Sequence, residues 1–366
     1  MQHLVVFALM LLPSCASWQG TTEVWTSGQG GYESYRIPSL IRANDGTMLA
    51  FCEGRVDGSA DSGNIDLVMR RSTDEGRTWG PMKVVWNDGV NTCGNPCPVV
   101  DRETGKIFLL ATRNLGHDTE SEIIRGVSEG TRTVWVIESV DHGRSWSAAK
   151  EITPETKSPS WSWYATGPGA GIQLQRGAFA GRLVIPCDHI EKESKKYFSH
   201  AIFSDDHGTT WQIGGTTPLD KVNECEVVEL EDGRLLLNMR NYDRSKKTRQ
   251  RAESLDGGVT WILQKHDVDL PEPICQASIR RLRWANGDQP GMLMFSNPAS
   301  SSQREKLSLR FSSDDGESWM RPQLIYAGSS AYSCLAVTQS GAPACLFEVD
   351  SYGRILYSKF RMPVNF

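Results

Sequence analysis

Polar side chains suited to binding an anion recur at the edges of short apolar runs along this 366-residue chain. They are Arg36, Asn95, Glu224, Gln276 and Tyr332 at the starts of such runs, Arg55, Arg113, Asp188 and Arg240 near the ends of the runs that follow, and Asp61 and Arg304 in the loops after those. Arginine has the planar, forked shape that recognises a carboxylate through two hydrogen bonds. If the fold brings these positions together, they would form a site for an anionic ligand.

A repeated eight-residue pattern, Ser-x-Asp-x-Gly-x-Ser/Thr-Trp, indicates the framework that could do so. It begins five times, at intervals of 67, 65, 50 and 58 residues: at Ser72, Ser139, Ser204, Ser254 and Ser312. Its Ser and Asp side chains can accept hydrogen bonds from turn amides, and its Gly tolerates a positive φ. Each copy follows a strand-like run, so we interpret it as the turn of a hairpin, with a structural role. Repeats of this period are typical of propellers and solenoids.

Two further strand-like runs recur six times between these turns. The first of each pair is expected near residues 35–41, 95–100, 169–174, 224–230, 276–279 and 332–337, and the second near 47–52, 106–112, 182–187, 234–239, 292–296 and 344–349. Together with the strands before and after each turn, they predict an all-β fold, a six-bladed β-propeller of four-stranded antiparallel blades. Residues 22–26 are expected to close the last blade, whose turn is degenerate near 350–353. No helix of consequence is expected, because sustained 3.6-residue periodicity is absent.

Strand direction predicts where the polar residues meet. In an antiparallel blade, the start of the first strand, the end of the second and the start of the third lie at one end of the sheet, and the repeated turn lies at the other. The polar residues named above should therefore converge on one mouth of the propeller, with the repeated turns on the opposite face.

Composition excludes several classes of protein. The net charge is −5, and there is no basic run that would favour nucleic acid as a partner. Cys93 and Cys97 are the only close cysteine pair, and no second pair completes a zinc site, so no metal is expected. The even spread of the repeats favours one domain over residues 18–366, with its oligomeric state left open.

The N-terminus resembles a secretory signal over residues 1–17, with an apolar run from Leu4 to Leu12 before small residues. This predicts a secreted or periplasmic protein; a lipoprotein with Cys15 at its cleavage site is the alternative, and a lysosomal location is less expected. No other segment is apolar enough to span a bilayer as a transmembrane segment. Six of the nine cysteines lie singly in apolar runs, so few or no disulfides are expected.

The combination of Tyr35-Arg36-Ile37-Pro38, the repeated Asp boxes and a tyrosine in the last blade resembles the exo-α-sialidase (neuraminidase) family from about Tyr35 to the C-terminus. The resemblance implies an arginine triad of Arg36, Arg240 and Arg304 that binds the substrate carboxylate. It implies catalytic roles for Asp61 as acid and base, Tyr332 as nucleophile and Glu224 as its partner. It also implies ligand contacts for Arg55, Asn95, Gln276 and Asp188, and no cofactor.

Several alternatives stay open at the level of sequence. Glu226 competes with Glu224, because period-two alternation places both on one side of the strand. Asp57 and Asp66 compete with Asp61, and Trp161, Trp163 and Tyr164 could line the pocket or pack in the core. The implied function is hydrolysis of terminal α-linked sialic acid from a glycoprotein, glycolipid or oligosaccharide. A trans-sialidase, or a sialic-acid-binding propeller without catalysis, are the other readings.

Overall fold

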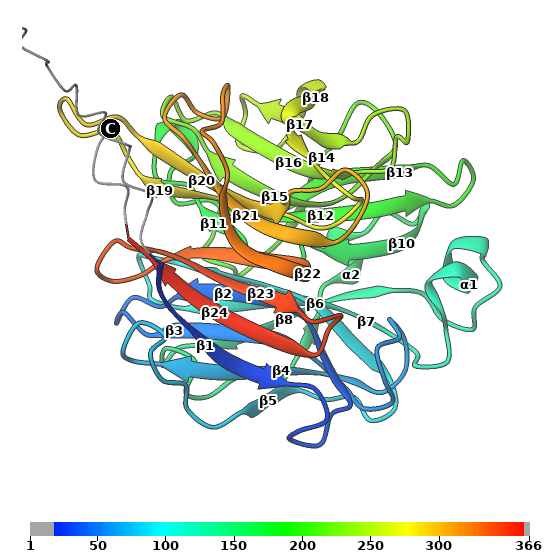
Figure 1. The fold of residues 1–366 in the computed structure, drawn as a ribbon. Helices are drawn as coiled ribbons and strands as arrows, with labels where there is room; N and C mark the ends of the chain where they lie inside the picture. Colours follow the sequence, from blue (N-terminus) through cyan, green and yellow to red (C-terminus); the bar gives the residue numbers. More distant parts are fainter. Residues whose placement is uncertain (1–17, 362–366) are drawn as a thin grey trace, which may run out of the picture.

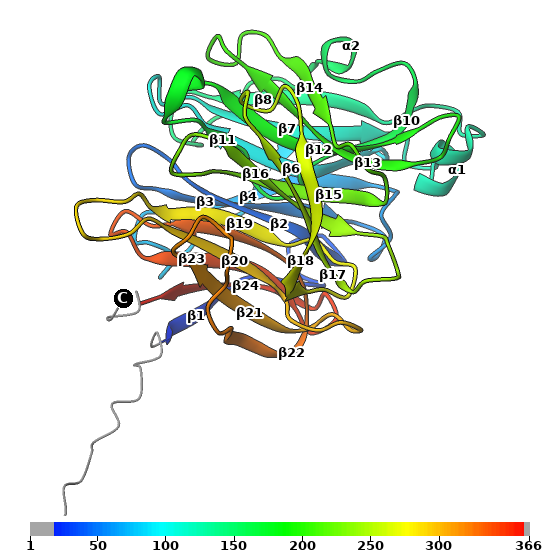
Figure 2. The same ribbon diagram turned by 90° about the horizontal axis from the view of Figure 1, so that it is seen from above.

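Alternating apolar and polar residues form β-strands over almost the whole chain. In the computed structural model, which describes residues 18–361, the strands form six antiparallel blades around a central axis (Figures 1 and 2). The predicted six-bladed β-propeller is confirmed.

The first three blades follow one another along the chain, each from its inner to its outer strand. Blade 1 holds β2 (Ser34–Arg42), β3 (Met48–Arg55), β4 (Ile65–Ser72) and β5 (Lys83–Trp86). Blade 2 holds β6 (Thr92–Val100), β7 (Ile107–Asn114), β8 (Thr133–Ser139) and β9 (Lys150–Glu151). Blade 3 holds β10 (Trp161–Thr166) with the short β11 (Ile172–Gln173), then β12 (Leu183–Glu191), β13 (Tyr197–Ser204) and β14 (Gln212–Thr216).

The last three blades include one long strand that two blades share. Blade 4 holds β15 (Val222–Glu229), β16 (Leu235–Asn241), β17 (Thr248–Ser254) and β18 (Ile262–Pro271). Blade 5 holds β19 (Ser278–Arg283), β20 (Met292–Pro298), β21 (Glu305–Ser312) and the first part of β22 (Gln323–Val337). Blade 6 holds the rest of β22, then β23 (Pro343–Val349), β24 (Arg354–Phe360) and β1 (Trp18–Thr26). The expected closure is present, because β1 pairs antiparallel with β24 (Figure 1).

One expectation needs correction. The first strand of blade 3 was expected at 169–174, but the inner strand is β10, and only Ile172 and Gln173 pair beyond it. Gly167-Pro168-Gly169 divides the two, since both glycines have positive φ and proline lacks an amide hydrogen. As a consequence, Trp161, Trp163 and Tyr164 are buried in the blade.

No helix of consequence was expected, and this agrees with the structure. Within residues 18–361 there are two short helices, α1 (Glu120–Arg125) and α2 (Thr153–Thr156), and a 3-10 turn at Gly177–Phe179. Helix α1 starts at a capping box, in which Thr119 and Glu122 exchange hydrogen bonds. Six residues are too few to produce a visible 3.6-residue periodicity, which is why the pattern missed it.

The five repeated turns fasten neighbouring blades, as their structural interpretation predicts. In the first turn, the Ser72 hydroxyl accepts the Gly76 amide at 2.8 Å, and Asp74 accepts the Thr78 amide at 2.9 Å. A Cβ on Gly76 would lie 2.0 Å from the ring of Tyr357 in blade 6. The Trp79 ring meets the same Tyr357 edge-on, with centroids 5.4 Å apart. The turn glycine is therefore required by close approach as well as by its φ of 84°.

A single carboxylate, Glu226, is fully buried at the centre of the propeller. It accepts hydrogen bonds from Ser278 Oγ at 2.8 Å, Ile279 N at 2.9 Å and Ala170 N at 3.3 Å, and Arg280 lies 3.8 Å away. Burial raises the pKa of Glu226 to about 7, against the lowering effect of Arg280 and these hydrogen bonds.

This buried carboxyl group predicts a pH-dependent stability. Below about pH 4.3, the pKa of an unfolded glutamate, Glu226 is protonated in both the folded and the unfolded protein. Between about pH 4.3 and 7 only the folded protein keeps this proton. The stability that protonated Glu226 contributes is therefore lost as the pH rises through this window. We expect the free energy of unfolding of the wild type to fall by on the order of 1 kcal/mol per pH unit in this window, relative to Glu226→Gln. Urea unfolding at several pH values measures the two slopes; parallel slopes would contradict the assignment. A constant offset between the proteins would not, because glutamine also changes the local hydrogen bonds.

The cysteines of the described residues are free thiols. The eight cysteines of the described part of the chain are all buried and free, from Cys52 to Cys345. Within residues 18–361, no helix has the length and apolar character needed to cross a bilayer. The expected secretory signal at residues 1–17 lies outside the described residues and stays a prediction.

Candidate active site

The inner strands are irregular where they reach one mouth of the propeller. Pairing register shifts between Arg36 and Ser39 in β2, and the same occurs near the starts of β6, β10 and β15 and at the point where β22 enters blade 6. At two of these bulges a residue before proline has positive φ, namely Ile37 at 61° and Asn95 at 55°. Such bulges re-aim side chains, and here they lie beside the polar residues of the mouth. The β-branched Ile37 is an outlier that its surroundings must hold in place.

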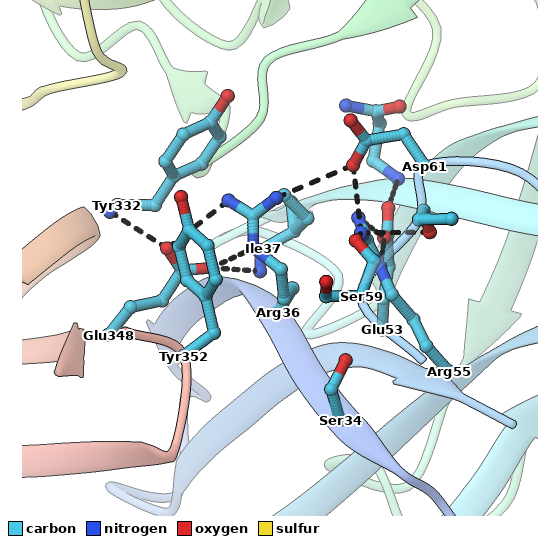
Figure 3. A network of polar contacts seen from close by, with 12 residues as sticks. Ser34, Arg36, Ile37, Glu53, Arg55, Ser59, Asp61, Tyr332, Glu348 and Tyr352 are labelled. Carbon is cyan, nitrogen blue, oxygen red and sulfur yellow. Dashed lines mark hydrogen bonds and ion pairs between the residues drawn. The ribbon is translucent and has the colours of Figure 1, made fainter. Parts of the chain in front are cut away.

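Buried carboxylates hold these bulges. Glu348 of β23 accepts the Ile37 amide at 2.8 Å and the Tyr332 amide at 3.1 Å, and it also binds the Arg36 guanidinium through both oxygens, at 3.2 and 3.3 Å (Figure 3). Burial alone would lower the pKa of Arg36, but Glu348 and other neighbours raise it above its ordinary value. One carboxylate thus fixes both the backbone and the side chain that present Arg36.

Tyr332 and Glu224 are in direct contact in the mouth. The Tyr332 hydroxyl donates to Glu224 Oε1 at 2.5 Å, and Arg240 donates to the other Glu224 oxygen at 2.7 Å and to the Tyr332 oxygen at 3.0 Å. Burial and the negative charge of Glu224 raise the pKa of Tyr332 well above its ordinary value, opposed by three arginines. The phenol is therefore neutral at rest and has a carboxylate in place to take its proton.

The three arginines of the predicted triad surround this phenol. The guanidinium carbon of Arg36 lies 5.1 Å from the Tyr332 ring centroid and that of Arg304 lies 5.6 Å from it, while Arg240 contacts the hydroxyl. Tyr352 lies between two of them: its ring stacks 4.0 Å from Arg36, and its hydroxyl accepts a 3.0 Å hydrogen bond from Arg304. Three cations around one buried tyrosine can bind a single carboxylate.

Asp61 stands at the solvent side of the same group, in the loop between β3 and β4 (Figure 3). Its carboxylate lies 2.8 Å from Arg55 and 3.4 Å from Arg36, and its side chain is 65% exposed. Desolvation acts to raise the pKa of Asp61, but the charges of Arg55 and Arg36 outweigh it and lower the pKa. Arg55 is itself buried and held by Glu53 at 2.6 Å. An exposed carboxyl between two arginines can meet a leaving group at the entrance.

The competing carboxylates lie elsewhere. Asp66 accepts from the Tyr32 hydroxyl and from Asn87, both at 2.6 Å, inside blade 1. Asp57 is exposed in the Asp61 loop and has no ion pair within the described residues. Glu226 is bonded by backbone amides at the centre of the propeller, away from Tyr332. The geometry therefore favours Asp61 and Glu224 for the two carboxylate roles.

The other predicted ligand contacts are placed differently from one another. The side-chain oxygen of Asn95 accepts a hydrogen bond from the buried Arg132, and its backbone N–H donates to Glu53 at 2.8 Å. The side-chain amide of Gln276 forms hydrogen bonds with the backbone of Pro168 and Ser333, and the residue is 1% exposed. Gln276 therefore connects inner strands below the mouth. Asp188 is fully buried, with one oxygen bound by Asn223 at 2.7 Å and the other without a partner. Burial, with Glu224 nearby, raises its pKa well above the ordinary value.

Sequence reasoning did not identify four residues of this region. Glu53, Glu348 and Tyr352 hold the arginines, and Glu120 of α1 contributes a further carboxyl group to the mouth. Desolvation raises the pKa of Glu120, and the charges of Asp61 and Glu224 add to it. The sequence did contain a sign of Glu53 and Glu348. Each is a lone glutamate in the apolar second strand of a blade, where a buried carboxylate needs a partner. Within residues 18–361, no group of three His, Cys, Asp or Glu side chains is arranged to hold a metal ion.

Comparison with known proteins identifies the family to which the chain is similar. Residues 46–345 match the BNR repeat-like domain family. A sialidase of Micromonospora viridifaciens is 35% identical over 92% of this chain and 53% of its own length, and a sialidase of Bacteroides fragilis is 30% identical over 88% and 61%. The solved structure of a Hadza microbial sialidase, Hz136, superposes with a TM-score of 0.84 at 32% identity, covering 92% of this chain and 67% of that one.

These relatives are longer than the protein described here. The chain spans about half to three fifths of the two curated sialidases, and the matched part is the propeller that carries the site. The family match over most of the chain, the fold and the mouth of arginines, carboxylates and tyrosine agree. The chain therefore belongs to the sialidase family of BNR-repeat propellers.

Proposed function

We propose that this protein is an exo-α-sialidase, a glycoside hydrolase that releases terminal α-linked sialic acid from glycoproteins, glycolipids or oligosaccharides with retention of configuration. The observation that supports it best is the Tyr332 hydroxyl, which lies 2.5 Å from a Glu224 oxygen with three arginines around the same phenol. Neither an anion-binding protein nor a structural propeller needs a carboxylate on that hydroxyl.

The substrate explains why the nucleophile is a phenol. Sialic acid carries its carboxylate on the anomeric carbon, so Arg36, Arg240 and Arg304 would bind this group beside the reacting atom. A carboxylate nucleophile would approach the same carbon against electrostatic repulsion. A neutral phenol avoids that repulsion, but with an ordinary pKa near 10 it needs a base, and Glu224 is in contact with it.

The proposed reaction has two steps. In the first, the Tyr332 oxygen attacks the anomeric carbon, its proton passes to Glu224, and Asp61 protonates the glycosidic oxygen, so that the aglycone leaves as an alcohol. In the second, water attacks the same carbon from the vacated side and gives a proton to Asp61. The bond to Tyr332 breaks, and Glu224 returns the proton to the phenolate. Two inversions give net retention; sialidases with a tyrosine nucleophile are a recognised variant of carboxylate-based glycosidases.

Product analysis with an α-linked sialyl-oligosaccharide tests this proposal. We expect free sialic acid to appear, and proton NMR to detect its α-anomer before mutarotation. Transfer of the sialyl group to a sugar or to its own hydroxyl, in place of water, would indicate a trans-sialidase. Saturable binding of the sialyl-oligosaccharide without any turnover would indicate a sialic-acid-binding propeller that is not an enzyme. We also propose export to the cell exterior or periplasm, which N-terminal sequencing of the mature protein would check.

Tyr352 is expected to position the arginine triad. Tyr352→Phe keeps the ring on Arg36 but removes the acceptor of the 3.0 Å hydrogen bond from Arg304. Because hydrogen bonds to charged groups contribute about 1.5–3 kcal/mol, we expect kcat/KM for a sialoside to fall by about tenfold or more, mainly through KM. Steady-state kinetics measure both parameters.

A matched control is Tyr357→Phe, which removes a hydroxyl hydrogen bond of 2.9 Å to Glu75 on the opposite face. It is expected to change thermal stability and leave kcat/KM near the wild-type value. Equal kinetic effects of the two substitutions would show that Tyr352 has only a structural role.

A further inference from the structure

A second cavity, of about 580 Å³, opens at the other end of the propeller axis. The far ends of the inner strands line it, including Arg42 of β2, Val99 of β6 and Leu335 of β22. Arg36 and Arg42 lie six residues apart on the same strand, which corresponds to about 20 Å at the usual rise per residue. The cavity is therefore separate from the catalytic mouth.

Five arginines from different parts of the chain line this cavity. They are Arg42, Arg102, Arg280, Arg281 and Arg283, against two acidic residues, Glu103 and Glu229. Glu229 is occupied by the amides of Gln175 at 2.7 Å and Arg176 at 2.8 Å. We refer to the five arginines with the space between them as the distal arginine cavity.

Three of these arginines lack a carboxylate partner. Within the described residues, Arg42, Arg102 and Arg283 form no ion pair, and their bonds go to neutral groups. Arg42 donates to the Val337 carbonyl at 3.1 Å, Arg102 to the Arg42 carbonyl at 3.0 Å, and Arg283 to the Pro290 carbonyl at 3.1 Å. Each guanidinium has five donors, so several remain free for a ligand.

The guanidinium groups also repel one another. Desolvation, followed by the charges of Arg42 and Arg280, lowers the pKa of Arg102 to about 10. Arg280 cannot turn away, because its two terminal nitrogens donate to the carbonyls of Gly171 at 3.0 Å and Ala170 at 3.1 Å. In a protein whose net charge is −5, this local concentration of positive charge is unusual. A bound anion would relieve the repulsion.

The shape of the cavity indicates the kind of anion. Its volume lies within the range of about 300–1,000 Å³ that small-molecule sites occupy, well above the size of a single inorganic ion. Its walls combine the arginines with the apolar ends of strands and with Trp284, which Arg176 and Arg281 both approach within 4.6 Å of the ring centroid.

We propose that the distal arginine cavity binds a small multivalent organic anion, of the class that carries two or more carboxylate or phosphate groups. This site is independent of the proposed sialidase reaction, since it lies at the opposite end of the axis and contains none of the catalytic residues.

Isothermal titration calorimetry with citrate and with fructose 1,6-bisphosphate, in a buffer free of both, tests the proposal. We expect at least one of them to bind the wild type with a dissociation constant below about 1 mM. Arg42→Gln/Arg102→Gln should weaken this binding by about tenfold or more. Arg77→Gln, which removes an exposed arginine on the first repeated turn, should leave it unchanged. Thermal unfolding should show that all variants remain folded.

The catalytic mouth also contains arginines, so the design must separate the two sites. Arg304→Gln is expected to leave distal binding intact. Binding that disappears in Arg304→Gln but survives in Arg42→Gln/Arg102→Gln would place the anion in the catalytic mouth and overturn the proposal. The absence of binding heat with both anions up to about 10 mM would overturn it as well.

Discussion

Tyr332→Phe is expected to reduce the turnover of a sialoside by at least about 10³-fold, because it removes the oxygen that we propose as the nucleophile. The substitution deletes one oxygen and keeps the ring, which packs against Ile37, Cys275 and Ala331. Burial and Glu224 raise the pKa of Tyr332, so the hydroxyl cannot ionise by itself near neutral pH, and the 2.5 Å contact with Glu224 supplies the base. Single-turnover and steady-state assays with a fluorogenic sialoside measure the loss.

Binding should survive this substitution. Arg36 and Arg304 keep their partners Glu348 and Tyr352, so Tyr332→Phe should still bind free sialic acid, as calorimetry can measure. If the variant turned over a sialoside at more than about a tenth of the wild-type rate, Tyr332 would not be the nucleophile.

Asp61→Asn is expected to have an effect that depends on the leaving group. A general acid contributes about 10²–10⁴-fold where the leaving oxygen needs a proton, so hydrolysis of a sialyl-sugar should fall by that amount. An aryl sialoside, whose phenol leaves without protonation, should lose much less in the first step. The 65% exposed side chain of Asp61 at the entrance is consistent with contact to the aglycone side.

The matched control for this prediction is Asp57→Asn, in the same loop. Asp57 is exposed and forms no ion pair within the described residues, so its substitution should leave both substrates near wild-type rates. An equal loss on both substrates in Asp61→Asn would indicate that Asp61 acts only by organising Arg36 and Arg55. A large, leaving-group-dependent loss in Asp57→Asn would transfer the acid role to that residue.

The repeated turns made the propeller predictable, because the Ser, Asp, Gly and Trp of each turn determine its conformation through contacts within the turn. The five repeated turns and the degenerate sixth one mark the six blades. Antiparallel pairing then determines which strand ends share a mouth. For that reason the sequence alone assigns Arg36, Glu224, Arg240 and Tyr332 to one opening, and their contacts agree with it.

Features that depend on contacts between blades could not be predicted in this way. Glu348 binds Arg36, which lies 312 residues earlier in the chain, and local pattern carries no information about such a pair. The bulge at Ile37 needs that carboxylate to hold a positive φ, so its conformation is a tertiary effect. Tyr352 was overlooked because the sixth repeated turn is degenerate, and three successive residues there, 350–352, adopt positive φ.

The ambiguity between Glu224 and Glu226 illustrates the same limit. Period-two alternation places both on one side of β15, so sequence alone could rank them only by their position along the strand. In the structure, the shift of register between Val222 and Cys225 separates them. Glu224 reaches the Tyr332 hydroxyl, whereas Glu226 binds the amides of Ala170 and Ile279 at the centre of the propeller.

The most direct test of the account is to trap the covalent intermediate. A suitable reagent is 2,3-difluorosialic acid, because its anomeric fluoride leaves readily while the fluorine on the neighbouring carbon slows hydrolysis of a covalent intermediate. After incubation with it, mass spectrometry of the intact protein and of its peptides should show one added sialosyl group on the peptide that contains Tyr332. The adduct should be absent from Tyr332→Phe. An adduct on Asp61 or Glu224, or turnover without any adduct on Tyr332, would contradict the proposed mechanism.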